Sequence, residues 1–325
     1  MTATALQAKV HPAVEGGLLL EVADLSVQTA SVTSITFTDP AGTALPGYVP
    51  GSHLVVQHGD GANAYSLTGS GRHPSEYTIS VLRVDDGAGG SLAMHRLAVG
   101  DLVRVSHPRS AFAPVATARH HLLIAAGIGI TPMLSHARAA AERDSEATLV
   151  YVYRPCQGAH VQEARELLGP ALAECTDRGS FQEELTRRLT DQKLGTHLYV
   201  CGPAAFMDTV LARARELGWP QGRLHSEPFG AVELDQGEPF TVNLARSGVT
   251  LEVPAGVSLL EALENAGKGV PNMCRKGVCG ECSLPVLRGA PLHRDLYLSE
   301  QEKSANTTMM CCVSRSLDQE LELDL

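Results

Sequence analysis

The feature that most constrains this chain is a loop that carries three cysteines within nine residues. The loop, residues 274–282, reads CRKGVCGEC, and its cysteines are Cys274, Cys279 and Cys282. Three thiolates converge on one centre from so short a loop only if the backbone bends tightly, and the glycines at positions 277 and 280 permit those bends. The C-x4-C-x2-C spacing, with a further cysteine about thirty residues on, is the plant-type ligand pattern of a 2Fe-2S cluster.

The fourth ligand is ambiguous because Cys311 and Cys312 are adjacent in the sequence. In a strand their side chains would point to opposite faces, so that only one of them would face the cluster. A zinc site or a set of unrelated thiols remains an alternative, although zinc prefers paired C-x2-C segments and the chain has one such pair. Since five of the eight cysteines lie in the last third, we expect metal or redox chemistry rather than disulfides.

Length and composition exclude several classes of protein. At about 150 residues per domain, the 325 residues predict two or three domains. A hydrophobic fraction of 44% and a charged fraction of 19% are ordinary globular values, so a disordered chain, a collagen and a small disulfide scaffold are excluded. The longest apolar run, residues 122–130, is too short to span a bilayer, and the N-terminus lacks the pattern of a signal peptide. We therefore expect a cytoplasmic protein without a membrane partner.

The net charge of -10 makes nucleic acid an unlikely partner, because an acidic surface does not approach a phosphate backbone. Along the chain the hydrophobic pattern changes twice. Residues 1–117 show short apolar alternations between turn residues, which predict a β-barrel or sandwich. Residues 118–230 alternate buried strands with helices, which predicts a parallel α/β sheet. Residues 231–325 combine a hairpin, the cysteine loop, a final strand and two helices opened by capping boxes at Ser258 and Ser299.

A glycine turn in the α/β region is a candidate nucleotide site. The strand ending at residue 126 leads into Gly127-Ile-Gly129-Ile-Thr131-Pro132, where we expect Thr131 as the N-cap and Pro132 as the first residue of a helix. Amides at a helix N-terminus favour pyrophosphate. The G-x-G-x-x-G fingerprint is absent, however, and any glycine turn between strand and helix has this pattern. Cys201-Gly202-Pro203 is a second candidate because it also follows a buried strand, although a buried cysteine equally fits a core.

Two polar breaks in the β region are candidate flavin or phosphate sites. Residues 63–69 read NAYSLTG, in which Tyr65 could stack on a planar ring, and Gly89-Gly90-Ser91 could cradle a phosphate. Both breaks also fit ordinary hairpin turns. The thirteen histidines show no metal-binding spacing, and no nucleophile with a neighbouring base is readable from the sequence.

Taken together, these segments resemble the phthalate dioxygenase reductase family, the iron–sulfur flavoprotein reductases of bacterial oxygenases. The resemblance extends from about Gly17 to Leu325 and rests on the segments YSLTG, AAGIGITPML, YVCGPAAFM, HSEPFG, CRKGVCGEC and CVSR. It implies an antiparallel FMN-binding barrel (1–117), a parallel-sheet NAD domain (118–230) and a β-grasp, ferredoxin-like 2Fe-2S domain (231–325). The oxygenase partner and a monomeric state are also implications of this resemblance.

The resemblance also assigns roles to individual residues. The residues that it assigns to binding of the flavin ring and phosphate are Tyr65, Ser66, Leu67, Thr68, Arg83, Gly89, Gly90 and Ser91. The residues that it assigns to the dinucleotide and to its junction with the flavin are Gly127, Thr131, Pro132, Cys201, Gly202, Pro203, Glu227 and Phe229. The cluster ligands are then Cys274, Cys279, Cys282 and, by the CVSR segment, Cys312.

One departure from the family concerns the flavin phosphate. The family carries an arginine two residues before the tyrosine of its flavin motif, whereas this chain has Asn63 there, preceded by Ala62. A missing guanidinium removes a bidentate contact, so either Arg83 or Arg72 compensates, FMN binds more weakly, or FAD replaces it. NADH is expected over NADPH because Arg154 stands alone after the second buried strand, without an arginine cluster for a 2'-phosphate.

The expected mechanism follows from the cofactors. NADH donates two electrons as a hydride and a 2Fe-2S cluster takes one electron at a time, so a flavin must lie between them. No protein acid or base is required, although Glu227 is expected near the nicotinamide–flavin junction. We expect the electrons to reach a Rieske-type non-haem iron oxygenase. The alternatives are a haem-thiolate monooxygenase as partner, or a non-catalytic iron–sulfur redox sensor.

Overall fold

The computed structural model describes most of the chain, namely residues 10–11, 14, 16–59, 61–87, 89–110, 112–229, 237–272, 277, 280–295 and 297–325. It divides into two compact units, Met1–Phe229 and Gly230–Leu325. Among the described residues, no helix is both long enough and apolar enough to cross a membrane.

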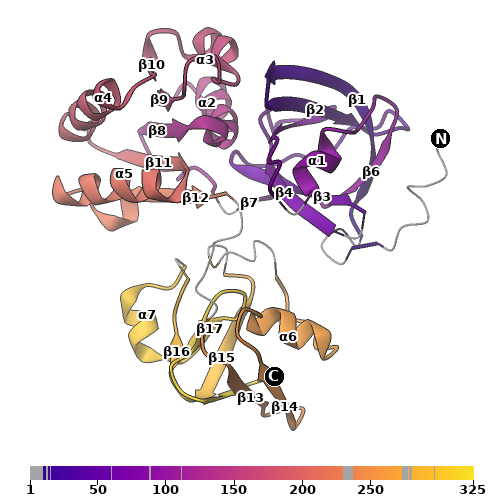
Figure 1. Cartoon of the computed structure of the whole chain (residues 1–325). Helices are drawn as coiled ribbons and strands as arrows, with labels where there is room; N and C mark the ends of the chain where they lie inside the picture. Colours follow the sequence, from indigo (N-terminus) through magenta and orange to yellow (C-terminus); the bar gives the residue numbers. More distant parts are fainter. Residues whose placement is uncertain are drawn as a thin grey trace. The chain divides into compact units, whose positions relative to one another are not determined.

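The first unit begins with a closed antiparallel barrel (Figure 1). Its strands pair in the order β4-β3-β6-β1-β2-β5, with β7 beside β3. A bridge between Leu67 and Ile79 joins β5 to the chain just after β4, which closes the row into a barrel. The elements are β1 (Leu18–Thr29), β2 (Val32–Thr38), β3 (Ser52–His58), β4 (Gly61–Ser66), β5 (Glu76–Leu82), α1 (Gly90–Met94), β6 (Leu102–Val105) and β7 (Arg109–Ser110).

A parallel sheet follows in the same unit, with the strand order β10-β9-β8-β11-β12. The order reverses between β8 and β11, and open α/β sheets bind ligands at the carboxyl ends of the strands at such a point. The strands are β8 (His120–Ala126), β9 (Glu146–Val152), β10 (Leu172–Cys175), β11 (Thr196–Gly202) and β12 (Leu224–Pro228). The helices are α2 (Ile130–Glu142), α3 (Val161–Leu168), α4 (Arg178–Thr190) and α5 (Ala204–Glu216), with short 3-10 turns at Gly127–Gly129, Gly169–Ala171 and Gln221–Arg223.

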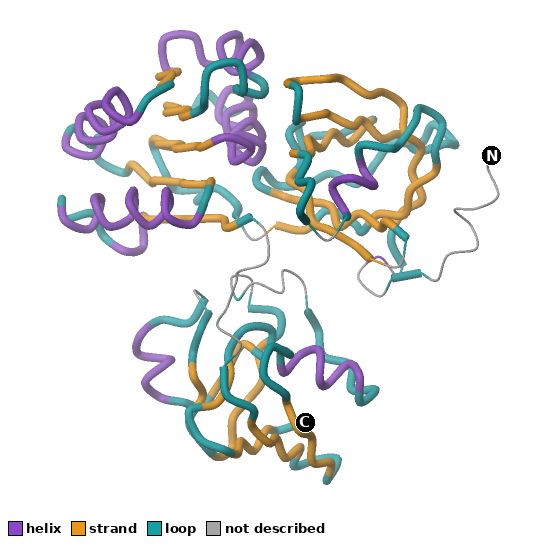
Figure 2. Tube along the Cα trace, viewed as in Figure 1, coloured by secondary structure: helices purple, strands orange, loops and turns teal. Residues whose placement is uncertain are grey.

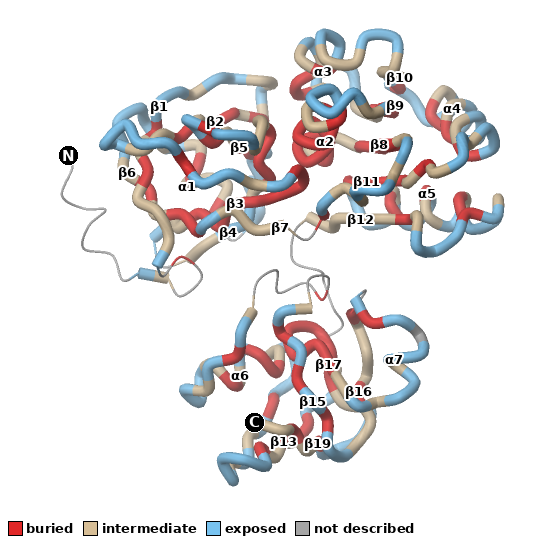
Figure 3. The backbone as a smooth tube through the Cα atoms, turned by 180° about the vertical axis from the view of Figure 1, so that it is seen from behind, coloured by how far each residue is buried: buried red, intermediate tan, exposed pale blue. Residues whose placement is uncertain are grey.

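Both faces of the parallel sheet are covered by helices (Figure 2). Successive side chains of a strand point to opposite faces. In β8, Leu123 and Ala125 pack with α2 and α3, whereas Leu122 and Ile124 pack with α4 and α5. The sheet is therefore buried between two helical layers, which Figure 3 shows as a buried centre with exposed outer helix surfaces.

The second unit is built on a mixed sheet in the order β14-β13-β19-β15-β17. Its first and last strands, β13 and β19, pair in parallel in the middle of this sheet. The apolar faces of α6 and the sheet share one core that includes Leu259, Leu263 and Val242. The elements are β13 (Phe240–Leu244), β14 (Val249–Val253), α6 (Leu259–Asn265), β15 (Ser283–Arg288), β16 (Pro291–Leu292), α7 (Glu300–Ala305), β17 (Thr308–Met310), β18 (Arg315–Ser316) and β19 (Glu320–Leu323).

The predicted fold class is confirmed: an antiparallel barrel, a parallel α/β sheet and a ferredoxin-like mixed sheet follow one another. The predicted domain boundary at 117 stays a prediction, because the first compact unit holds both of its sheets. Ser299 and Glu302 form the expected reciprocal capping box, and the Ser258 hydroxyl accepts the amide of Glu261.

The predicted role of Thr131 as a helix N-cap is wrong. The helix already begins at Ile130, directly after the 3-10 turn, so that Thr131 and Pro132 lie inside its first turn. The Thr131 hydroxyl donates to the Ile128 carbonyl at 3.0 Å instead of capping an amide. The 3-10 turn extends the helical chain toward β8 by three residues, which the sequence pattern did not indicate.

Candidate functional site

The glycine turn after β8 lies directly against the end of β11. A Cβ at position 129 would collide with the carbonyl group of Cys201, whose carbon would lie 2.6 Å away, and would lie 2.9 Å from the Gly202 amide nitrogen. Only glycine permits this approach of two backbones. The turn and the Cys201-Gly202-Pro203 segment, two separate sequence candidates, therefore form one site at the topological switch point.

Buried side chains hold the turn from below. The Tyr151 hydroxyl lies 3.2 Å from the Gly127 carbonyl oxygen and 3.1 Å from that of Ala159, and burial raises the pKa of Tyr151 so that it stays a neutral donor. Thr131 and Pro132 are both buried. These side chains build the turn, and its backbone is the part that remains to contact a dinucleotide.

The structure places next to one another the residues of β11 and β12 that the resemblance assigns to the nicotinamide–flavin junction. Cys201 and Glu227 are paired in register, and the Cys201 thiol donates to the Glu227 carbonyl oxygen at 3.1 Å. Pro203 is exposed and precedes α5. Phe229, just beyond β12, packs against the core on the α2 side of the sheet. The carboxyl ends of β11 and β12 thus border the glycine turn.

Arg154 is exposed just beyond β9 and has no ion-pair partner among the described residues. Arg165 of α3, the next arginine along the chain, is already engaged, because Glu174 accepts two hydrogen bonds from it at 2.8 and 2.9 Å and a third from Tyr153. The contacts to Arg165 hold the pKa of Glu174 below its usual range. One free guanidinium at this strand end matches a cofactor without a 2'-phosphate.

The flavin motif lies on β4 and the residues after it. Tyr65 and Ser66 pair with Leu54 and His53 of β3, and burial raises the pKa of Tyr65. Leu67 is fully buried in the barrel core. The Thr68 amide and hydroxyl both donate to the Thr78 carbonyl, at 3.0 and 3.3 Å. Leu67 and Thr68 thus close the barrel with their side chains, while Tyr65 remains for a ring contact.

Residues 89–91 form the tight turn that opens the short helix α1 beside β3 and β4: Gly89 is its N-cap, and Gly90 and Ser91 are its first residues. A Cβ at Gly90 would collide with the Asn63 amide and lie 2.6 Å from His58 Nε2. The Ser91 hydroxyl accepts the Val84 amide at 3.0 Å and is therefore used within the turn. The turn brings its backbone to the place where the family's arginine is replaced by asparagine.

Neither arginine proposed as a substitute joins this turn by a contact in the structure. Arg83 is exposed and pairs with Asp85 at 2.7 Å. Arg72 lines a groove of 340 Å³ together with Tyr48 and Glu142, between the barrel and the later part of α2. The sequence missed His58, whose Nε2 is buried and has no hydrogen-bond partner in the described part of the chain. Only the β3–β4 register, which pairs position 58 with 61, reveals that His58 lies near Asn63.

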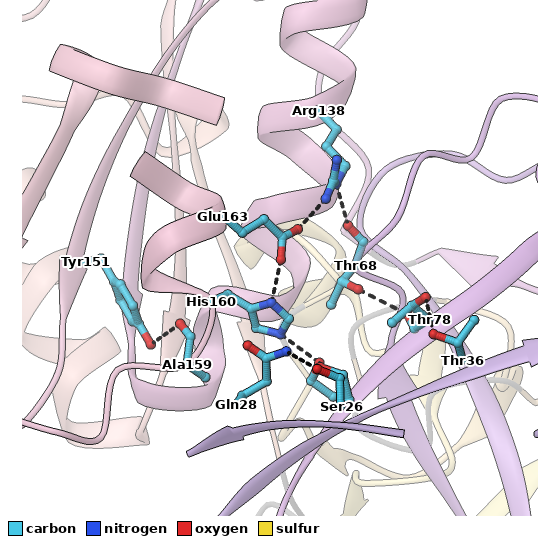
Figure 4. Close-up of polar contacts among 12 residues, drawn as sticks. Ser26, Gln28, Thr36, Thr68, Thr78, Arg138, Tyr151, Ala159, His160 and Glu163 are labelled. Atoms are coloured by element: carbon cyan, nitrogen blue, oxygen red, sulfur yellow. Dashed lines mark hydrogen bonds and ion pairs between the residues drawn. The ribbon is translucent and has the colours of Figure 1, made fainter. Parts of the chain in front are cut away.

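A polar network joins the barrel to the nucleotide region within the first unit (Figure 4). Arg138 of α2 donates to the Thr68 carbonyl at 3.2 Å and pairs with Glu163 of α3. Glu163 also contacts His160, whose other ring nitrogen lies 2.7 Å from the Ser80 hydroxyl of β5. No local pattern of residues predicts this network, because its members lie on elements far apart in the chain.

The buried His121 and His136 and the half-buried His225 lie beside Tyr199 on the α2 side of the same sheet. Burial lowers the pKa of His121 and of His225 to about 4 and that of His136 to about 3. His136 stays neutral and donates from Nε2 to the Phe112 carbonyl at 2.7 Å, and its ring packs on Tyr199. These histidines are a core feature, and no metal site forms among them in the described residues.

In the cluster loop the structure describes two of the four expected ligands. Cys274 and Cys279 lie outside the described residues. The sulfurs of Cys282 and Cys312 are buried and lie 3.1 Å apart. At Gly277 (φ 70°) a Cβ would lie 2.6 Å from Val313 and 2.9 Å from the Asp295 backbone, so this position of the loop requires glycine. These residues fit a 2Fe-2S cluster.

The strand argument that separated Cys311 from Cys312 is wrong. The strand β17 ends at Met310, and both cysteines lie in the turn that follows it. Hydrogen bonds from Cys311 and Cys312 lower the pKa of Cys282, while the contact with Cys282 raises that of Cys311. Both thiols therefore approach Cys282, and alternation along a strand does not choose between them.

Two family descriptions match the sequence. Residues 103–224 match "Dimethylamine monooxygenase subunit DmmA-like, N-terminal domain". Residues 242–316 match the "2Fe-2S iron-sulfur cluster binding domain". The second match covers the cysteine loop together with Cys311 and Cys312, which excludes the zinc alternative.

Three similar proteins cover nearly the whole chain. The heme-dependent oxidative N-demethylase beta subunit of Ectopseudomonas mendocina is 42% identical over 94% of this chain and 98% of that protein. The solved phthalate dioxygenase reductase has a TM-score of 0.73 and 35% identity, covering 97% of this chain and 100% of that one. A type IV self-sufficient cytochrome P450 monooxygenase has a TM-score of 0.80 and 30% identity over 98% of this chain, which spans 43% of that longer chain.

Proposed function

This chain belongs to the phthalate dioxygenase reductase family, and on that premise we propose that it supplies electrons to a haem-dependent oxygenase that demethylates an amine. It is an NADH-dependent reductase component of an oxygenase system, and its cofactors are FMN and a 2Fe-2S cluster. Two similarities support the choice of partner: the 42% identity to a heme-dependent N-demethylase beta subunit, and the match to a dimethylamine monooxygenase subunit family.

Bound FMN and the cluster supply the conversion of a hydride into single electrons. The chain's own residues bind the cofactors and orient them. The single observation that carries the site is the contact of Gly129 with the Cys201 carbonyl group, which joins the glycine turn to the end of β11. We place the dinucleotide there, with Arg154 toward its far end and Glu227 and Phe229 beside the nicotinamide. No side chain needs to move a proton in this arrangement.

For the flavin, we place the ring against Tyr65 and Ser66 and the phosphate at the turn 89–91. His58 and Asn63 both lie against Gly90, and each carries a nitrogen that can donate a hydrogen bond. Together they offer two donors where the family uses one guanidinium. Asn63 is exposed and its amide nitrogen donates to the Tyr65 hydroxyl at 3.4 Å, so it joins the proposed phosphate contact of the buried His58 Nε2 to the proposed ring contact of Tyr65.

For the cluster, we propose Cys274, Cys279, Cys282 and Cys312 as ligands. The choice of Cys312 over Cys311 rests on the resemblance of the CVSR segment to the family; the sulfur–sulfur distance of 3.1 Å between Cys282 and Cys312 agrees with it, and Cys311 approaches Cys282 as well. Hydrogen bonds that lower the pKa of Cys282 favour the thiolate, which is the form that binds iron.

A Rieske-type oxygenase is the second candidate partner, favoured by the similarity to phthalate dioxygenase reductase over both full chains. The deciding experiment reconstitutes the purified reductase and NADH with each partner in turn. A haem-dependent N-demethylase subunit would be followed by the Soret band, and a Rieske oxygenase by its reduced iron signal. We expect faster haem reduction and amine-dependent formaldehyde release; faster reduction of the Rieske protein would overturn the proposal.

A cytoplasmic location and a monomeric state stay predictions. Sedimentation velocity of the holoprotein tests the monomeric state, for which a single species near the chain mass of 34.4 kDa is expected. Cell fractionation tests the cytoplasmic location. The family membership favours the reductase over the redox-sensor alternative, because a sensor would need no NADH site.

A further inference from the structure

The barrel and the parallel sheet are joined by a continuous chain of polar contacts, and we propose that Arg138, Glu163 and His160 are positioning residues for hydride transfer. The inference rests on the proposed nucleotide and flavin sites. These three side chains touch neither cofactor. They fix the angle between the strand end that carries the flavin motif and the turn that carries the dinucleotide.

The first arm of the network starts at the flavin motif. Thr68 stands two residues after Ser66, and its carbonyl oxygen accepts a hydrogen bond of 3.2 Å from Arg138 Nε. Arg138 lies on α2, the helix that begins at the glycine turn. The other side of the same guanidinium pairs with Glu163. One arginine therefore links the end of β4 to the nucleotide helix (Figure 4).

The second arm starts on the barrel sheet. The Ser34 and Ser80 hydroxyls lie 2.8 Å apart, and Ser80 lies 2.7 Å from His160 Nε2. The adjacent Ala159 carbonyl lies within hydrogen-bond distance of the Tyr151 hydroxyl, which also reaches the Gly127 carbonyl. This arm therefore runs from the barrel to the glycine turn itself.

Glu163 is the centre at which both arms meet. One carboxylate oxygen pairs with Arg138, and the other lies 2.6 Å from His160 Nδ1. Burial raises the pKa of Glu163, but the hydrogen bonds from His160 and Arg138 outweigh this and hold its pKa below the usual range. The carboxylate therefore stays ionised and binds two donors at once.

Two observations indicate that this network holds the barrel and the parallel sheet of the first unit in a fixed arrangement. The side chains of His160, Ser80 and Ser34 are almost completely buried, and a buried polar group that loses its partner destabilises the fold. His160 also adopts φ 57°, a left-handed conformation that is unfavourable for a residue with a side chain. Hydride transfer demands close alignment of donor and acceptor, and a misplacement of about 1 Å costs about a hundredfold in rate.

The test is Glu163→Gln, which keeps the shape and removes the charge, with Glu166→Gln as the matched control on the exposed face of α3. In the part of the chain that the structure describes, the Glu166 carboxylate accepts a hydrogen bond from Gln162 of its own helix at 2.7 Å and forms no ion pair. Stopped-flow mixing of the anaerobic holoprotein with NADH measures the rate of flavin reduction, the NADH concentration at half-saturation and the nicotinamide–flavin charge-transfer absorbance. Flavin and iron contents are measured alongside.

We expect Glu163→Gln to slow flavin reduction at saturating NADH about tenfold to hundredfold and to weaken the charge-transfer band. Half-saturation, flavin content and iron content stay at the wild-type level, and Glu166→Gln behaves as wild type. A merely structural role would change cofactor content or melting temperature and leave the band intact. A normal rate with a normal band overturns the positioning role.

A second pair of variants keeps the test decisive if Glu163→Gln folds poorly. Arg138→Lys retains the charge but not both contacts, and Arg138→Met removes both. We expect flavin reduction to be fastest in the wild type, slower in Arg138→Lys and slowest in Arg138→Met; equal rates in all three proteins overturn the inference. If the wild-type protein itself shows no NADH-driven flavin reduction, the proposed nucleotide and flavin sites fail instead, which is a separate result.

Discussion

The nucleotide site of the first unit and the cluster loop of the second are built in opposite ways. Three of the four proposed cluster ligands lie within nine consecutive residues of the cluster loop. The nucleotide site collects Gly129, Cys201 and Glu227 from the ends of three strands, and nearly a hundred residues separate its first member from its last.

The difference lies in what each ligand needs. A cluster is held by bonds to sulfur, so the spacing of a few cysteines defines the site and survives as a pattern in the sequence. A dinucleotide is held by backbone amides and by the close approach of two strand ends, which any glycine turn imitates in sequence. Loss of one ligand should therefore abolish the cluster, whereas damage to the nucleotide site should be graded.

The largest expected effect concerns the fourth cluster ligand. Cys312→Ser should abolish the cluster, with loss of its visible absorption and of bound iron, while NADH still reduces the flavin, because the nucleotide site lies in the first unit. Cys311→Ser is the matched control and should keep the cluster. Iron content and the spectrum of the NADH-reduced protein measure both; a cluster retained in Cys312→Ser and lost in Cys311→Ser would exchange the two assignments.

The second prediction concerns the close approach of two backbone segments in the proposed nucleotide site. Gly129→Ala inserts a methyl group against the Cys201 carbonyl, so the turn must move away from β11. We expect weaker NADH binding, at least about tenfold, and a stability loss of about 1–3 kcal/mol. Gly222→Ala, where nothing lies within 4 Å of the added carbon, is the control. Titration of flavin reduction with NADH checks it, and a wild-type response would disprove the close-packed turn.

The third prediction separates the two units by pH. His121, His136 and His225 have pKa values lowered by burial to about 4, 3 and 4, and an unfolded histidine has a pKa of about 6.5. Between these values the unfolded chain binds more protons, so the first unit is fully stable above pH 6.5 and loses stability as the pH falls. Each histidine contributes at most about 1.4 kcal/mol per pH unit.

The second unit contains one of the thirteen histidines, so a smaller pH dependence is expected for it. Trp219 is the chain's single tryptophan and is buried in the first unit, so its fluorescence in urea reports that unit alone. The urea midpoint should fall from pH 7.5 to pH 5.5, while that of the second unit, followed by cluster absorption, changes less. His136→Gln should reduce the pH dependence; an equal fall in both units would contradict the explanation.

The smallest expected effect concerns the flavin phosphate. His58→Ala should weaken FMN binding about tenfold, the value of one hydrogen bond to a charged group, and leave riboflavin binding unchanged. Asn63→Arg, which restores the family's residue, should strengthen FMN binding and rescue His58→Ala. Fluorescence titration of the flavin-free protein measures both ligands, with exposed His107→Ala as control. An equal loss for FMN and riboflavin would mean that His58 supports the turn and not the phosphate.

Part of this protein was readable from its amino acids. The alternation of apolar residues predicted a barrel or sandwich, and the spacing of the cysteines predicted the cluster site, because both patterns depend on neighbours along the chain. The capping box at Ser299 agrees with the structure for the same reason. Residue types also identified Asn63 as a departure from the family.

Only the tertiary structure decided which separate segments meet. Sheet order placed the Gly129 turn beside Cys201, hairpin register placed His58 beside Asn63, and packing brought Arg138 to Thr68. Register and packing depend on the whole chain, so no local pattern encodes them. The error at Cys311 and Cys312 has the same cause: a turn replaces the expected strand once β17 has ended at Met310. The sequence thus determined the kinds of site, and the fold determined which residues complete them.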